Sequence, residues 1–90
     1  MFKTLEELIS VIRQRKRFST EESYTNKLLN NKKLSVEKVK EEITELVDAI
    51  EKDTNKVHEA ADVLYHLMVL LEANGIKIED VMNELKNRQK

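Results

Sequence analysis

Apolar residues recur along this chain every three or four positions, which is the period of amphipathic α-helices. In the first segment one face carries the apolar side chains Phe2, Leu5, Leu8, Ile9 and Ile12. A basic run from Arg13 to Arg17 ends this segment. Ser19 and Glu22 have the spacing of a capping box, and they predict the start of a short second helix that includes Tyr24 and Leu29.

A third helix is predicted after a loop from Asn30 to Lys33, with Ser35 as its N-cap. The apolar face of this helix carries Val36, Val39, Ile43, Leu46, Val47 and Ile50. Because proline is absent and short polar stretches separate the periodic segments, the pattern predicts an all-α fold. We expect an antiparallel bundle of four to five helices that forms one domain over residues 1–90.

The fourth segment begins after a polar break, in which Thr54 or Asn55 can act as N-cap, and runs to about Asn74. Gly75, the only glycine, follows as a left-handed C-terminal cap would. A last helix is predicted over about Ile78–Arg88.

The fourth helix is apolar almost all round, which is typical of a helix that is buried on most sides. Its apolar residues are Ala60, Ala61, Val63, Leu64, Leu67, Met68, Val69, Leu70 and Leu71. A chain of 90 residues has little material to cover such a helix. We therefore expect a homo-oligomer, either a dimer or a tetramer.

Composition excludes several classes of function. The chain has no cysteine, so it has no disulfide scaffold, thiolate nucleophile or cysteine-based metal site. Sixteen basic and seventeen acidic side chains leave a net charge of −1, which argues against nucleic acid as the partner. No apolar run is long enough to span a membrane, and the N-terminus carries charges where a signal peptide would not. The expected compartment is the cytoplasm.

Carboxylates gather on two of the predicted helices. The third helix carries Glu42 and Glu45 at the edge of its apolar face, with Glu41 further toward solvent. On the fourth helix Glu59 and Asp62 share a strip with His66. Each pair alone is also typical of a solvated helix face, and His66 alone of a buried, hydrogen-bonded histidine. An antiparallel pairing of the two helices could bring the carboxylates of Glu42, Glu45, Glu59 and Asp62 together. Four carboxylates suit a hard divalent cation, Mg²⁺ or Mn²⁺.

Three motifs resemble the phosphoribosyl-ATP pyrophosphohydrolase family, which catalyses the second step of histidine biosynthesis. They are S-Y-T at Ser23–Thr25, K-V-K-E-E-x-x-E at Lys38–Glu45 and E-A-A-D-V-L-Y-H-L at Glu59–Leu67. The resemblance covers nearly the whole chain and implies the all-α fold of the MazG-type nucleoside triphosphate pyrophosphatases. It also implies that Glu42, Glu45, Glu59 and Asp62 bind Mg²⁺, which Mn²⁺ can replace.

The resemblance implies hydrolysis of the α–β phosphoanhydride of phosphoribosyl-ATP, a small nucleotide substrate, to phosphoribosyl-AMP and pyrophosphate. Glu41 or one of the ligands Glu42 and Glu45 would take the proton of the attacking water. The candidates for substrate binding are Lys38, Arg13, Arg17, Tyr24, Thr25, Lys27 and His66. Lys40 stands where the family usually has glycine. A house-cleaning pyrophosphatase for other nucleotides is therefore kept as an alternative. A catalytically silent helical interaction module, whose acidic strip merely solvates a dimer surface, is a separate alternative.

Overall fold

The computed structural model describes residues 2–18 and 23–89, and the regular structure within these ranges is entirely helical. The elements in chain order are α1 (Lys3–Arg17), α2 (Tyr24–Leu29), α3 (Lys32–Lys52), α4 (Lys56–Ala73) and α5 (Ile78–Arg88). The predicted all-α class is confirmed. No helix of the described ranges combines the length and the apolar character that crossing a membrane needs.

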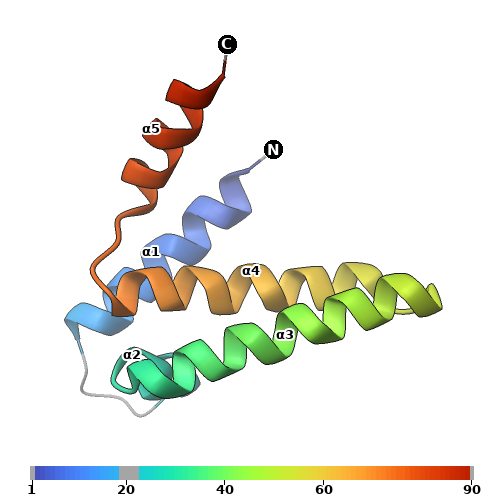
Figure 1. Cartoon of the computed structure of the whole chain (residues 1–90). Helices are drawn as coiled ribbons and strands as arrows, with labels where there is room; N and C mark the ends of the chain where they lie inside the picture. Colours follow the sequence, from blue (N-terminus) through green and yellow to red (C-terminus); the bar gives the residue numbers. More distant parts are fainter. Residues whose placement is uncertain (1, 19–22, 90) are drawn as a thin grey trace.

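Helices α3 and α4 form an antiparallel hairpin, against which α1 and α2 pack (Figure 1). The two hairpin helices have the most extensive contact of any pair. The tight turn between them contains Asp53 and Asn55 at positive φ angles of 56° and 43°, which these residue types tolerate better than most. The predicted polar break between the third and fourth helices is therefore confirmed. Asn55 occupies the N-cap position of α4, but its side chain makes no capping hydrogen bond.

The cap of the third helix differs from the sequence prediction. Helix α3 begins at Lys32, inside the predicted loop, and Asn31 caps it by accepting a hydrogen bond from the Leu34 amide across 3.0 Å. Ser35 was the wrong choice because its hydroxyl is buried and donates to the Leu28 carbonyl at 2.5 Å. This bond joins α3 to α2.

The start of the second helix is set by Ser23. Its hydroxyl accepts a hydrogen bond from the Asn26 amide across 3.1 Å, and the helix begins at the next residue, Tyr24. The predicted capping pair Ser19 and Glu22 lies outside the described residues.

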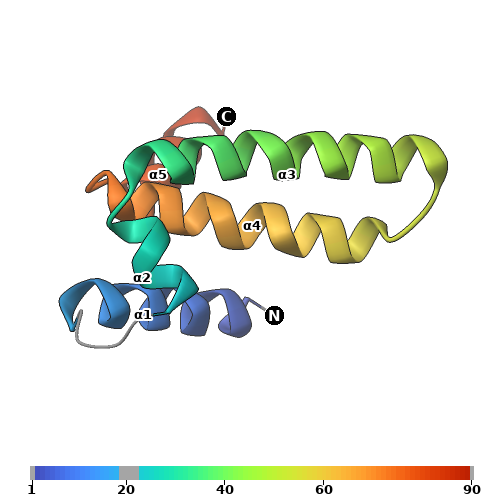
Figure 2. The ribbon, with the colours of Figure 1, turned by 90° about the horizontal axis from the view of Figure 1, so that it is seen from below.

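The hydrophobic core lies where α1 and α2 cross the C-terminal half of α4 (Figure 2). Ile12, Leu28 and Val69 are at most 1% exposed there. The rest of the hairpin extends beyond α1 and α2 toward its turn. In this single chain α4 is only partly covered, and Leu64 is 47% exposed.

The end of α4 has a Schellman motif. The amides of Gly75 and Ile76 donate to the carbonyls of Glu72 and Leu71, and Gly75 has a φ of 70°. This confirms the predicted left-handed cap. The Lys16 ammonium of α1 also donates to the Glu72 carbonyl, so α1 holds the end of α4 from outside.

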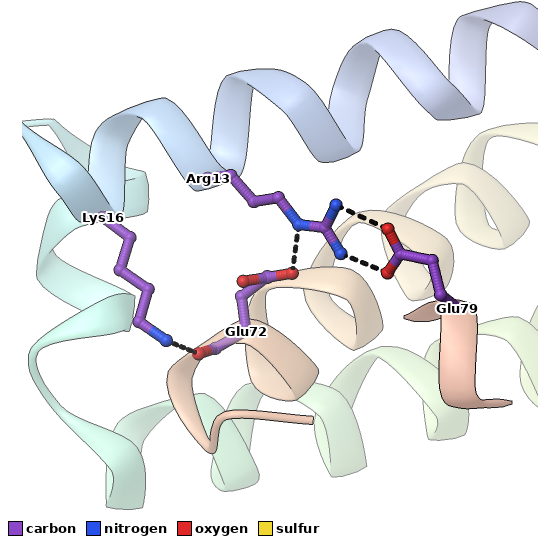
Figure 3. A network of polar contacts seen from close by, with 4 residues as sticks. All are labelled: Arg13, Lys16, Glu72 and Glu79. Carbon is purple, nitrogen blue, oxygen red and sulfur yellow. Dashed lines mark hydrogen bonds and ion pairs between the residues drawn. The ribbon is translucent and has the colours of Figure 1, made fainter. Parts of the chain in front are cut away.

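Helix α5 projects away from the hairpin and has no extensive contact with another helix of the described chain (Figure 1). Arg13 of α1 tethers its first turn. The guanidinium donates from Nε to Glu72 at 2.8 Å and from its two terminal nitrogens to Glu79 at 2.9 and 2.6 Å (Figure 3). This paired contact lowers the pKa of Glu79 to about 2. One arginine therefore links α1, α4 and α5.

Candidate functional site

The hairpin brings the carboxylates of α3 and α4 together. One carboxylate oxygen from each of Glu41, Glu42 and Glu45 lies within 4.8 Å of the other two. Across the hairpin, Asp62 lies close enough to Glu42 for its charge to raise the pKa of that group, and Glu45 does the same to Glu59. We call these five residues the carboxylate cluster.

Burial makes this cluster electrostatically costly. Glu42 is only 9% exposed. The Oε2 atoms of Glu42 and Glu59 are buried and have no hydrogen-bond partner among the described residues. Burial is the main reason why the pKa of both groups is raised, and contacts with the Glu45 carboxyl raise it further. A buried carboxylate without a partner destabilises the fold unless a cation compensates its charge.

Lys38 is the cation at the rim of the cluster. Its Nζ lies 3.3 Å from Glu41 Oε2, and this contact raises the pKa of the ammonium. Its charge also acts on the Tyr24 hydroxyl, whose pKa burial raises and Lys38 lowers. Lys38 therefore interacts both with the acidic residues of α3 and with Tyr24 of α2.

Tyr24 and Thr25 join α2 to α4 through hydrogen bonds. The Nδ1 atom of His66 lies 2.8 Å from the Asp62 carbonyl, which can only accept, so Nδ1 carries the proton. In the neutral ring Nε2 then accepts from the Tyr24 hydroxyl across 3.0 Å. Thr25 Oγ1 and the Tyr65 hydroxyl lie 2.5 Å apart. These groups hold the turn of α4 that carries Asp62.

Three predicted phosphate ligands form no hydrogen bond or ion pair with the cluster among the described residues. Arg13 is held by Glu72 and Glu79, and Glu72 lies ~15 Å further along α4 than Asp62, at about 1.5 Å per residue. Arg13 and Arg17 line a pocket of about 520 Å³ on α1. Lys27 is exposed on α2. Their predicted contact with substrate is untested.

Comparison with known proteins assigns the family. Residues 5–89 match the family described as phosphoribosyl-ATP pyrophosphohydrolase. The chain belongs to this family. It is similar to the phosphoribosyl-ATP pyrophosphatase of Pyrobaculum calidifontis, with 46% identity over 96% of this chain and 95% of the relative. The corresponding enzyme of Clostridium novyi is 43% identical over 96% of this chain and 81% of its own length.

Some relatives carry this region inside a longer protein. The histidine biosynthesis bifunctional protein of Pyrococcus furiosus is 44% identical over 96% of this chain. The matched part is only 41% of that protein, so the chain spans less than half its length. The relatives therefore include longer proteins as well as proteins near this length.

One residue beside the cluster is absent from the sequence-based site candidates. His58 Nε2 lies 3.4 Å from Asp62 Oδ2, and a ring nitrogen of His58 forms a group with oxygens of Glu59 and Asp62 in which all atoms lie within 4.8 Å. The signal in the sequence is the spacing of four residues between His58 and Asp62, which places both on one helix face.

We predict that Glu42→Gln stabilises the metal-free protein at neutral pH. The raised pKa of Glu42 means that its stabilising contribution is present below the ordinary value of 4.5 and is lost as the pH rises through the raised pKa. Glutamine does not ionise, so the variant does not lose this stability as the pH rises. Its melting temperature in the presence of a chelator should exceed that of the wild type by a few degrees near pH 7. The difference should shrink toward pH ~4.5.

Thermal unfolding followed by circular dichroism measures both values, with Glu51→Gln on the exposed side of α3 as the matched control. A Glu42→Gln variant that is less stable than the wild type near neutral pH would show that Glu42 has a stabilising partner within the chain.

Proposed function

We propose that this chain hydrolyses the α–β phosphoanhydride of phosphoribosyl-ATP to phosphoribosyl-AMP and pyrophosphate. Membership of the family supports the substrate and the reaction. The observation that supports the chemistry is the buried Glu42 carboxylate, whose Oε2 atom has no hydrogen-bond partner among the described residues and whose neighbours include Glu45 and Asp62. Stability alone does not favour such a group, whereas catalysis on a triphosphate needs negative groups that hold a cation.

The donor set fits Mg²⁺, with Mn²⁺ as a substitute. The proposed ligands are the carboxylates of Glu42, Glu45, Glu59 and Asp62, and hard divalent cations prefer oxygen donors of this kind. The orphaned Oε2 atoms of Glu42 and Glu59 support this assignment because each still needs a positive partner. When bound, such an ion neutralises phosphate oxygens and lowers the pKa of a coordinated water.

Other side chains of the site have separate tasks in this proposal. Lys38, which is half-buried at the rim, binds a phosphate oxygen when substrate displaces Glu41 from its ammonium group. Glu41 is exposed and is not needed as a ligand, so we assign to it the proton of the attacking water. Tyr24, through His66, positions the turn of α4 that carries Asp62.

We also propose that the protein works as a homodimer. Its accessible surface is 7017 Å², whereas a compact monomer of 10.6 kDa exposes about 5500 Å². The excess of about 1500 Å² per chain amounts to about 3000 Å² for two chains, which is within the range that obligate homodimer interfaces bury. The radius of gyration of 14.2 Å likewise exceeds the ~12 Å of a compact chain of this length.

Two exposed apolar surfaces support a second copy of the chain as the partner. Exposed apolar side chains on α3 fall within about 60° of one another around the helix, away from the exposed Glu41 and Glu45. They are Val36, Ile43, Val47 and Ile50. An apolar groove of about 940 Å³ also lies between α1, α4 and α5, where Leu64, Leu67 and Leu71 line it. A tetramer would need a further surface of this kind.

A cytoplasmic location completes the proposal. The proposed substrate carries several negative charges and does not cross membranes, so it is consumed in the compartment where it is made. The proposal involves neither nucleic acid nor a membrane as partner.

The reaction products test the proposed activity. Incubated with phosphoribosyl-ATP and Mg²⁺, the protein should release pyrophosphate and phosphoribosyl-AMP, which ion-exchange chromatography separates. Asp62→Asn should lower the rate at least ~100-fold because a metal ligand loses its charge. Release of orthophosphate would contradict α–β cleavage. Faster turnover of ordinary or damaged nucleoside triphosphates than of phosphoribosyl-ATP would instead favour the house-cleaning function.

Two neighbouring lysines of α3 test the phosphate contact. Lys38→Ala should lower kcat/KM about 10-fold or more because Lys38 lies at the rim of the cluster. Lys40→Ala removes the same charge from an exposed position of the same helix and should change kcat/KM less than about twofold. Equal effects of the two variants would show that Lys38 acts only through the overall charge of the protein.

Sedimentation equilibrium tests the dimer. The wild type should sediment as a dimer at micromolar concentration, and Ile43→Glu, which places a charge in the exposed apolar stripe of α3, should be mainly monomeric. Asp48→Lys, an exposed charge change on the same helix, should remain dimeric. A folded wild-type monomer at that concentration would contradict the burial argument.

A further inference from the structure

His58 lies at the outer edge of the carboxylate cluster, one helical turn before Asp62. Its Nε2 is 3.4 Å from Asp62 Oδ2, and the ring also faces Glu59, whose pKa its charge lowers. One ring nitrogen and one oxygen from each of Glu59 and Asp62 lie within 4.8 Å of one another. The side chain is 72% exposed, so the ring is accessible from solvent.

An ordinary surface ion pair does not account fully for this arrangement. An exposed pair at a spacing of four residues on a helix adds little stability. Asp62, however, also faces Glu42, a carboxyl that is 9% exposed and whose buried Oε2 has no partner among the described residues. The Glu59 Oε2 atom is buried and unpartnered as well. The imidazole is therefore adjacent to a cluster whose five carboxylates outnumber the one lysine at its rim, Lys38.

We propose that His58 is a nitrogen ligand for a divalent cation at this edge of the cluster, together with Glu59 and Asp62. The proposal rests on the proposed function, because it assumes that the cluster holds a cation. It adds a ligand that the family motifs do not contain, since His58 lies immediately before E-A-A-D. Residues four apart on a helix can present two donor atoms to one ion, as two histidines do in helical zinc sites.

The nitrogen donor determines which ions the site favours. Mg²⁺ prefers oxygen ligands and gains little from an imidazole. Co²⁺ and Zn²⁺ bind imidazole well and bind a given site of mixed nitrogen and oxygen donors more tightly than Mn²⁺ does. His58 therefore gives this chain a higher affinity for Co²⁺ and Zn²⁺ than its carboxylates alone would give.

Calorimetric titration of the full chain with Co²⁺ and with Mg²⁺ tests this role. His58→Gln keeps a neutral side chain of similar size but removes the imidazole nitrogens. It should weaken Co²⁺ binding about 10-fold or more and change Mg²⁺ binding less than about twofold. The visible absorption of bound Co²⁺ should also change because a nitrogen ligand is lost. Val57→Ala, at the neighbouring position that is 85% exposed, should leave both affinities and the spectrum unchanged.

The outcomes separate this inference from the proposed function. If the wild type and His58→Gln bind Co²⁺ equally well and both bind Mg²⁺, His58 is not a ligand and the carboxylate site stands. If the wild type binds neither ion, both proposals are wrong. The melting temperature of the metal-free variant, which should equal that of the wild type, confirms that the exposed substitution leaves the fold intact.

Discussion

The burial of the Glu42 carboxylate between α3 and α4 is the constraint on which the rest of the structure depends. Its neighbours are the carboxyls of Glu45 and Asp62 and the imidazole of His66, while Lys38 of the same helix is in contact with Glu41. The hairpin can keep this group only if apolar packing elsewhere offsets its desolvation. The core around Ile12, Leu28 and Val69 provides that packing at the other end of α4.

The hairpin therefore has separate surfaces for separate tasks. One surface carries the carboxylate cluster and is bordered by α2, whose Tyr24 reaches His66. Another carries the exposed apolar stripe of α3, and a separate apolar groove lies between α1, α4 and α5. Arg13 fixes the direction of α5, and thus the shape of that groove, through Glu72 and Glu79. Chemistry and the proposed dimerisation can then change independently, because they use different faces of the same two helices.

Much of the fold could be predicted from the sequence because helical periodicity is a local property. The last helix and the glycine cap after α4 follow from residues within one or two turns. The start of α3 could not be predicted in this way. Asn31 and Ser35 are both good caps, and the hydrogen bond of Ser35 to Leu28 exists only once α2 packs against α3.

The candidate site shows the same division between local and distant information. The spacing of Glu42, Glu45, Glu59 and Asp62 indicated that a hairpin could bring them together, and the structure places them as neighbours. The ion pairs of Arg13 could not be predicted from local spacing. Glu72 and Glu79 lie about sixty residues away in the sequence and contact Arg13 only in the tertiary fold.

A crystal grown with Mn²⁺ tests the central claim most directly, because the anomalous scattering of the ion locates it without any assumption about activity. We predict a peak between α3 and α4, within about 2.5 Å of carboxylate oxygens of Glu42 and Asp62. The peak should be absent from crystals of the Glu42→Gln variant. A wild-type map that shows manganese only at exposed carboxylates elsewhere, and none beside Glu42, would contradict the account.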